Sequence, residues 1–138
     1  MKTEIKLKKG YGPVDFSMGI KEVMEILGEP SEVEQIGEEM EMPATVMHYD
    51  ELELSFFFEC NENEVLVCIN IENTDTTLFG EKIMGKSKKF ITDLMNANKI
   101  YEQTMDKEVW DEERISYDKY AIDFFFNEDK LESITIGR

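Results

Sequence analysis

Apart from its carboxylates, the sequence contains few side chains that could do chemistry. A single histidine, His48, precedes Tyr49, and two cysteines, Cys60 and Cys68, stand on either side of the polar stretch NENE. No Cys-x-x-Cys pair, nucleophile elbow, phosphate-cradling glycine loop or cluster of metal ligands accompanies them. With 31 Asp and Glu in 138 residues, neighbouring carboxylates are expected by chance and do not indicate acid–base catalysis. We expect a protein that is not an enzyme and that holds no cofactor.

We expect both cysteines to be reduced. They should lie on the two arms of one hairpin, with Cys60 beside the turn and Cys68 further along the second arm. That offset exceeds the Cα separation of roughly 4.4 to 6.8 Å that a disulfide spans. The acidic turns ECNENE and NEDK offer alternating oxygen side chains, but neither has the spacing of a calcium loop. Hairpin turns are the simpler interpretation, and calcium binding by these turns is the alternative.

The distribution of charge is more informative than the net charge of -16. Between Lys21 and Lys82 the sequence has no Lys or Arg, while Asp and Glu recur throughout. We name this segment, 22–81, the acidic stretch. Its field repels nucleic acid and anionic lipid and attracts basic proteins. We therefore expect a basic protein as the partner, no nucleic acid and no membrane. An acidic surface that only keeps the protein soluble is the alternative.

The length of 138 residues fits one domain. The lysine-bearing start MKTEIKLKKG is followed by no apolar run of signal-peptide length, and no run of roughly 18 apolar residues occurs elsewhere. We expect a cytoplasmic protein, either a monomer or a weak homodimer.

The chain matches itself when it is shifted so that Tyr49 falls on Tyr117. The shift aligns YD at 49–50 with YD at 117–118, and FFF at 56–58 with FFF at 124–126. After a shorter turn in the second copy, Ile69 and Ile71 match Ile134 and Ile136. This pattern indicates an internal duplication. We predict a single domain, 1–138, built of two repeats (about 11–75 and 79–138) that share one core.

Within each repeat the apolar spacing changes from helical to alternating. Helices are predicted at about 18–27, with Ser17 as N-cap and a stop at Gly28, and at about 87–96, with Ser87 as N-cap. The predicted strands lie at about 32–37, 45–49, 52–59, 65–72, 99–105, 113–117, 119–126 and 131–136. The expected fold class is α+β: two tandem α-β-β-β-β repeats form a curved, mostly antiparallel sheet with the helices packed on one face.

The third strand of each repeat carries one phenylalanine that the core does not require. Strand alternation places Phe56 and Phe58 on the helix-covered face and turns Phe57 away from it, beside Glu53. Phe125 turns away in the second repeat in the same manner. We predict Phe57, Phe125 and Glu53 as partner-binding residues on the uncovered face.

Two loops add candidate contacts. The shift that aligns the repeats places Met42 of EEMEMP on Trp110 of DKEVWDEER, each among acidic residues. An aromatic or soft apolar side chain at the tip of an acidic hairpin is suited to anchor a protein partner. The alternative is that Trp110 folds back onto its own sheet. The candidate partner-binding residues of these loops are Glu38, Glu39, Glu41, Met42 and Trp110.

The helix and its exit, FSMGIKEVMEILGEPSEV, followed by a strand meander, resemble the unit of the outer-membrane assembly lipoprotein family SmpA/BamE. Two such units in tandem look like the architecture of the beta-lactamase inhibitor proteins. The resemblance implies a protein that binds other proteins, in the tandem inhibitors through a concave sheet face. The chain lacks the lipid-attachment cysteine of the lipoproteins, and its second copy has Asn96-Ala97-Asn98 in place of the Gly-Glu-Pro exit.

Together these features predict a non-catalytic acidic protein-binding protein. Its most concrete form is a cytoplasmic immunity or inhibitor protein that occludes a basic toxin or enzyme through the uncovered sheet face. The alternative is a small-ligand-binding or homo-oligomerising module of a larger assembly, in which a second copy buries Phe57 and Phe125.

Overall fold

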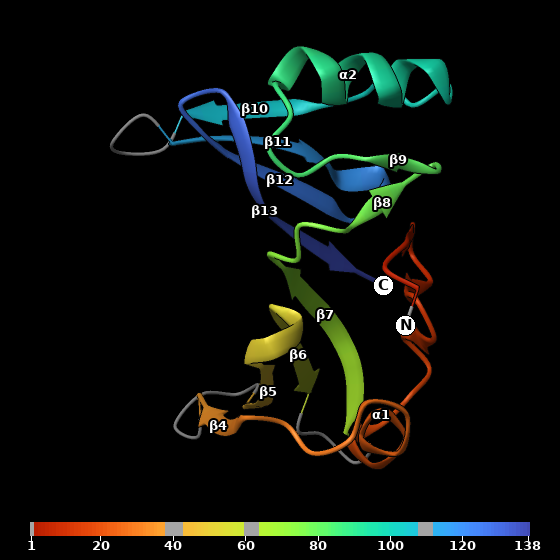
Figure 1. The fold of residues 1–138 in the computed structure, drawn as a ribbon, viewed down its shortest axis with the longest axis vertical. Coiled ribbons are helices and arrows are strands. Elements are labelled where there is room, and N and C mark those ends of the chain that lie inside the picture. Colours follow the sequence, from red (N-terminus) through yellow and green to blue (C-terminus); the bar gives the residue numbers. More distant parts are fainter. Residues whose placement is uncertain (1, 38–42, 60–63, 108–111) are drawn as a thin grey trace.

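An eight-stranded sheet forms the body of the molecule (Figure 1). The structure is a computed structural model and describes residues 2–37, 43–59, 64–107 and 112–138. The strands lie side by side in the order β10-β11-β12-β13-β7-β6-β5-β4, and all neighbours are antiparallel. Each half of the chain thus runs as a meander from one edge of the sheet to its centre. The bounds are β4 (Glu32–Ile36), β5 (Ala44–Tyr49), β6 (Leu54–Glu59), β7 (Val65–Ile71), β10 (Thr104–Lys107), β11 (Glu112–Tyr117), β12 (Ile122–Asn127) and β13 (Lys130–Gly137).

Two helices accompany the sheet, and Figure 1 places them at opposite ends of the long axis of the molecule. They are α1 (Ile20–Leu27) and α2 (Lys88–Ala97). Ser87 caps α2 as predicted, because its side chain accepts a hydrogen bond from the Phe90 N–H at 3.1 Å. The prediction of Ser17 as the cap of α1 is wrong: Gly19 is the N-cap, and the Ser17 hydroxyl donates to Asp15 instead. Within the described ranges, no helix combines the length and apolar character needed to cross a bilayer.

All eight predicted strands exist, but three of them begin late. Strand β10 starts at Thr104, whereas the sequence predicted a start near Lys99. Lys99 has a left-handed φ of 62°, and the Ile100 N–H donates to the Met95 carbonyl, so this stretch closes the end of α2 rather than extending. The third strand of each half also begins late, because 3-10 turns precede it: η1 (Asp50–Leu52) and η2 (Asp118–Tyr120).

Short pairings that the sequence did not predict hold the N-terminal residues. They are β1 (Ile5–Lys6), β2 (Gly10–Tyr11) and β3 (Val14–Asp15) in one small sheet, and β8 (Thr77–Leu78) with β9 (Glu81–Lys82) in another. A parallel bridge between Glu4 and Thr77 joins the two sheets. Gly10 is required at its position, because its φ is +153° and a Cβ there would lie 2.1 Å from the Val14 carbonyl oxygen. Strands this short carry too little periodicity to be predicted.

The buried side of the large sheet carries the row expected from strand alternation. Along β6, Leu54, Phe56 and Phe58 are buried and the residues between them are partly exposed, and β12 repeats this pattern. One cluster of buried side chains contains this row from both halves together with Val23 of α1 and Ile91 of α2. The same cluster therefore joins helices and sheet.

A tyrosine flanks the buried row in each half. Tyr49 meets Phe56 edge to face with ring centroids 5.6 Å apart, and Tyr117 meets Phe124 at 6.0 Å. The Tyr49 hydroxyl donates to the Gly28 carbonyl at 2.8 Å, which ties the end of α1 to the sheet. Burial raises the pKa of both phenols. The repeated YD pair thus marks the point where each second strand turns into its 3-10 turn.

Several elements of the two halves begin at residues that the sequence shift aligns. Strand β5 begins at Ala44 and its equivalent β11 at Glu112, and the third strands β6 and β12 begin at Leu54 and Ile122. Both 3-10 turns end in a left-handed residue, with a φ of 53° in the first half and 51° in the second. The ladder also shifts register between the second and third phenylalanine of each FFF run.

Candidate functional site

The side chains that alternate with the buried row form the opposite face of the large sheet, which we name the Phe57 face. Strand register assigns its members, because directly paired residues project to the same side. Most of them are partly exposed, but Val46 is only 2% exposed and Ser116 5%. The members in β5, β6, β7, β11, β12 and β13 are Ala44, Val46, His48, Ser55, Phe57, Glu59, Cys68, Asn70, Arg114, Ser116, Asp123, Phe125, Asn127, Ser133, Thr135 and Gly137.

A row of polar residues crosses this face from one edge of the sheet to the other. At its centre Asn70 of β7 pairs with Thr135 of β13. The His48 Nδ1 and the Ser55 Oγ lie 2.8 Å apart and form a hydrogen bond within the row. In order across the eight strands, this polar row consists of Glu32, His48, Ser55, Asn70, Thr135, Asp123, Ser116 and Thr104.

Phe57 and Phe125 lie on opposite sides of the polar row. Phe57 comes two positions after Ser55 and Phe125 two positions after Asp123, and β6 and β12 run in opposite directions. Neighbouring strands lie about 4.8 Å apart and each residue adds about 3.4 Å along a strand. The distance across the strands from β6 to β12 and the opposite offsets along them together place the two residues about 20 Å apart. The rings therefore form two separate spots rather than one shared patch.

The two spots have different neighbours. Phe57 is paired with Val46 on one side and Cys68 on the other, which gives an apolar surface. Phe125 is paired with Arg114 and Ser133 at the equivalent positions. The first spot thus offers an apolar centre, whereas the second is polar and carries a cation.

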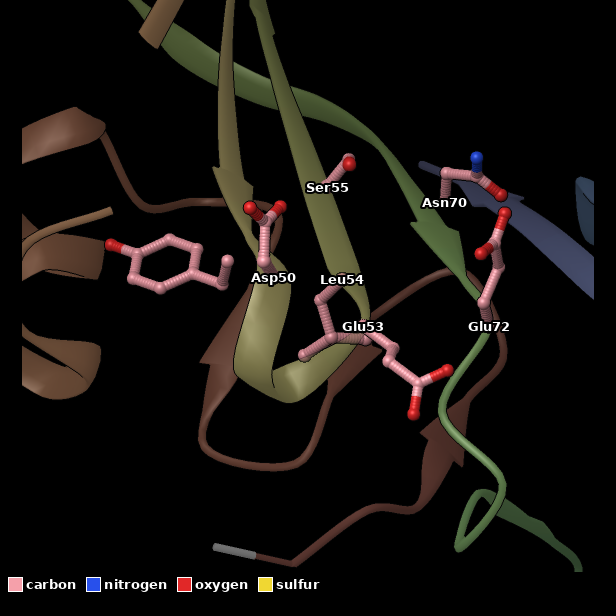
Figure 2. Close-up of a pocket in the computed structure, with 7 residues that line it drawn as sticks. Asp50, Glu53, Leu54, Ser55, Asn70 and Glu72 are labelled. Atoms are coloured by element: carbon pink, nitrogen blue, oxygen red, sulfur yellow. The ribbon is translucent and has the colours of Figure 1, made fainter. Parts of the chain in front are cut away.

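An acidic hollow opens at Ser55 and Asn70, two members of the Phe57 face (Figure 2). Its volume is about 170 Å³. Its acidic members are Asp50, Glu53 and Glu72, and the Glu72 N–H donates to the Glu53 carbonyl at 2.9 Å. Figure 2 shows the Glu72 carboxylate directed toward the side chain of Asn70. The complete lining is Tyr49, Asp50, Glu53, Leu54, Ser55, Asn70 and Glu72.

The contact between His48 and Ser55 has the residue types of a nucleophile and its base. Glu34 stands on the far side of the imidazole, with its Oε2 3.7 Å from the His48 Nε2. Acyl transfer also requires donors placed for the developing oxyanion. Ser55 lies inside a strand that is paired on both sides, so the ladder engages the backbone N–H groups around it. We interpret the contact as a structural part of the polar row.

Neither metal nor thiol chemistry is indicated in the part of the chain that the structure describes. No group of three or more His, Cys, Asp or Glu side chains there is placed to hold a metal ion. Cys68 is a free thiol. Burial, and to a smaller extent the charge of Asp123, raises the pKa of this thiol to about 11. The thiol is therefore protonated at neutral pH and a poor nucleophile.

Three of the predicted site residues can be placed. Phe57 and Phe125 lie on the Phe57 face, and Glu53 is an exposed member of the hollow. The remaining candidates lie outside the described residues: Glu38, Glu39, Glu41, Met42, Trp110.

The structure adds residues to this face that the sequence did not single out. Val46, Cys68 and Arg114 flank the two phenylalanines, and Asn70 and Glu72 line the hollow. Alternation along single strands was readable in the sequence. The register between strands was not, because it depends on where the turns and bulges fall.

No family model matches the chain, and no curated protein matches it. Among solved structures, the chain is similar to an extracellular protein containing a SCP domain from Bacillus anthracis str. Ames, with 15% sequence identity and a TM-score of 0.46. The similarity covers 95% of this chain and 49% of the other, so the chain spans about half the length of that protein.

Proposed function

We propose that this chain is a non-catalytic binding protein that recognises a basic protein through the Phe57 face. Its most concrete form is a cytoplasmic immunity or inhibitor protein that covers a basic toxin or enzyme. One observation carries the proposal: an apolar spot around Phe57 lies beside a hollow that contains Glu53 and Glu72. An apolar centre with a charged rim is the usual composition of a specific interface.

The charge distribution supports the choice of a basic partner. The first half of the Phe57 face belongs to the acidic stretch, which has no Lys or Arg. Electrostatic steering by such a surface raises association rates toward about 10⁸ to 10⁹ per molar per second at low salt. Burial of the ring then slows dissociation.

The proposal includes a tandem fold. We infer that the two halves are copies of one unit, related by an approximate two-fold axis that passes between Asn70 and Thr135. The central register supports this, because Ile71 pairs with Ile134 and Ile69 pairs with Ile136. In this arrangement the sheet is curved and both helices pack on its buried side, as in the tandem inhibitor proteins that the sequence resembles.

Covering of this face by a second copy of the chain is the competing function. It gains no support from charge, because two acidic surfaces would meet in such a dimer. A small-ligand module has no specific observation in its favour.

The test compares the chain with its Phe57→Ser/Phe125→Ser double variant in capture from a lysate of the native host. The proposal expects a captured protein of basic isoelectric point that the double variant fails to hold. Urea melts of both chains provide the control, since loss of capture counts only when the midpoint is retained. Capture of the same protein by both folded chains would reject the Phe57 face, and a stable symmetric dimer that buries Phe57 would favour the competing function.

A further inference from the structure

The two edges of the large sheet carry most of the exposed apolar side chains. Val33 and Ile36 belong to β4, Met105 belongs to β10, and Tyr101 lies shortly before β10. Val33 is 54% exposed and Met105 is 53% exposed. Within the described residues, the large apolar side chains that are exposed are Ile26, Val33, Ile36, Phe79, Tyr101 and Met105.

Among the residues that the structure describes, strand β4 lacks most features by which proteins protect an edge. Natural edge strands are blocked by lysines, prolines, bulges or a covering element. Every residue of β4 is exposed, and none is Lys or Pro. Its register with β5 runs through consecutive pairs from end to end without a shift. Among the strands that the structure describes, only β5 pairs with β4, so β4 is the edge of the sheet.

The side chains of β4 alternate between the two faces of the sheet, and both of its carboxylates lie on the same face. Glu32 and Glu34 pair with His48 and Val46, so they project to the Phe57 face. Val33 pairs with Met47, which is 1% exposed and belongs to the buried cluster, so it projects to the other side. A strand laid against β4 would meet Glu32, Glu34 and the exposed Ile36 on one face of the sheet. On the other face it would meet Val33.

We propose that β4 is a docking edge for an extended, basic segment of the partner protein, which adds a ninth strand to the sheet. Main-chain hydrogen bonds supply the general attraction in this binding mode, and alternate side chains supply the selectivity. The segment places Lys or Arg beside Glu32 and Glu34 and an apolar residue beside Val33. This inference rests on the proposed function in one respect, the basic character of the partner.

Charge argues for this occupant over a second copy of the chain. Two β4 strands side by side would bring the carboxylates of Glu32 and Glu34 together, and like charges on paired strands are destabilising. The acidic side chains thus hinder self-pairing and leave the edge open to a strand of opposite charge.

The probe is an acetylated, amidated octapeptide of alternating Lys and Val, titrated into the isotopically labelled chain and followed by NMR. We expect saturable shifts at the amides of β4 and slower hydrogen exchange at those that face outward. The same peptide with every second amide N-methylated has lost one row of donors and should bind at least tenfold more weakly. Equal binding of the methylated peptide, or shifts confined to the surroundings of Phe57, would overturn the docking edge.

Variants at the two edges supply the matched control. Glu32→Gln/Glu34→Gln removes two cross-strand charge pairs and should weaken peptide binding about two- to thirtyfold. Met105→Lys changes an equally exposed residue on the opposite edge and should leave the affinity unchanged. A loss in Met105→Lys as large as in the glutamine variant would contradict the assignment to β4.

The peptide titration and the capture experiment with the Phe57→Ser/Phe125→Ser variant together separate this inference from the proposed function. If the peptide fails to bind β4 while a basic partner still requires Phe57, the docking edge is wrong and the proposed function stands. If the peptide binds β4 and no basic partner requires Phe57, the edge stands and the Phe57 face is rejected.

Discussion

The two halves of the sheet agree on one face and differ on the other. On the buried side, Tyr49 corresponds to Tyr117, and each half contributes a phenylalanine pair and two isoleucines at matching positions. On the Phe57 face the matching positions carry different chemistry, with Phe57 and Phe125 as the exception. The differing pairs, first half against second, are Val46 and Arg114, His48 and Ser116, Ser55 and Asp123, Glu59 and Asn127, Cys68 and Ser133, and Asn70 and Thr135.

This contrast separates what packing demands from what it leaves free. Both halves fill one buried cluster, so the side chains at matching positions of the two halves are similar in size and polarity. The Phe57 face is under no such demand, and its first half carries apolar and acidic residues together. The hollow shows the same asymmetry, because Ala121 and Gly137 stand where the first half has Glu53 and Glu72.

The largest expected effect tests the buried side of the sheet, on which the two halves agree. Phe56→Ala and Phe124→Ala should each lower the free energy of unfolding by about 3 to 5 kcal/mol, because both rings are fully buried. Their costs should be similar, since the two rings occupy matching positions. Urea melts measure both, with Phe57→Ser as the comparison. A cost of Phe57→Ser as high as that of Phe56→Ala would place Phe57 in the core.

The next effect concerns Cys68, which stands where the second half has Ser133. Burial raises its pKa from the ordinary value of 9.0 to about 11. A group whose pKa is raised by folding stabilises the fold below pH 9 and loses this contribution as the pH rises toward 11. Because the thiol is partly exposed, solvent screening reduces the effect, and the native chain should lose about 2 kcal/mol more stability than Cys68→Ser between pH 8 and pH 11. Equal losses in urea melts at the two pH values would show that the thiol is not desolvated.

Most of the fold could be predicted from the sequence, because the signals that carry it are local. Alternation along the strand predicted the buried Phe56 and the partly exposed Phe57, and Ser87 was identified as a cap. The late start of β10 was missed because a left-handed Lys99 leaves no mark in the apolar pattern. The chemical neighbours of the candidate site were missed for another reason. Which residues flank Phe57 depends on the register between strands, which no single strand encodes.

The third effect tests which spot is the centre of binding. Phe57→Ser should weaken the capture of a basic partner about thirtyfold, as is typical for an aromatic anchor worth about 2 kcal/mol or more. Phe125→Ser should cost less, because Arg114 beside it disfavours a basic surface. The double variant should abolish binding. Titration of the captured partner against each variant checks the order, and a larger loss in Phe125→Ser would move the centre to the second half.

The smallest effect concerns the acidic rim. Glu53→Ala reproduces the residue that the second half has at this position, Ala121. It should slow association by a factor of about 1.4 to 5 at 50 mM salt, because one exposed charge contributes about 0.2 to 1 kcal/mol, and the difference should vanish at 500 mM. Glu128→Ala is the control, since Glu128 is also exposed and left-handed but lies in the turn after β12. Stopped-flow rates that are equal for the native chain and Glu53→Ala at low salt would exclude steering through the hollow.

The pairing of β7 with β13 at the centre of the sheet has a consequence for folding. Within each half, neighbouring strands are joined by short connections, but Asn70 and Thr135 belong to different halves of the chain and still pair directly. Closing so long a loop costs more chain entropy than closing a hairpin, so the central ladder should form after the two meanders. Until it does, each half has a bare inner strand that fits the complementary strand of another molecule equally well. Refolding at high protein concentration should therefore yield swapped dimers in which β7 of one chain pairs with β13 of the next.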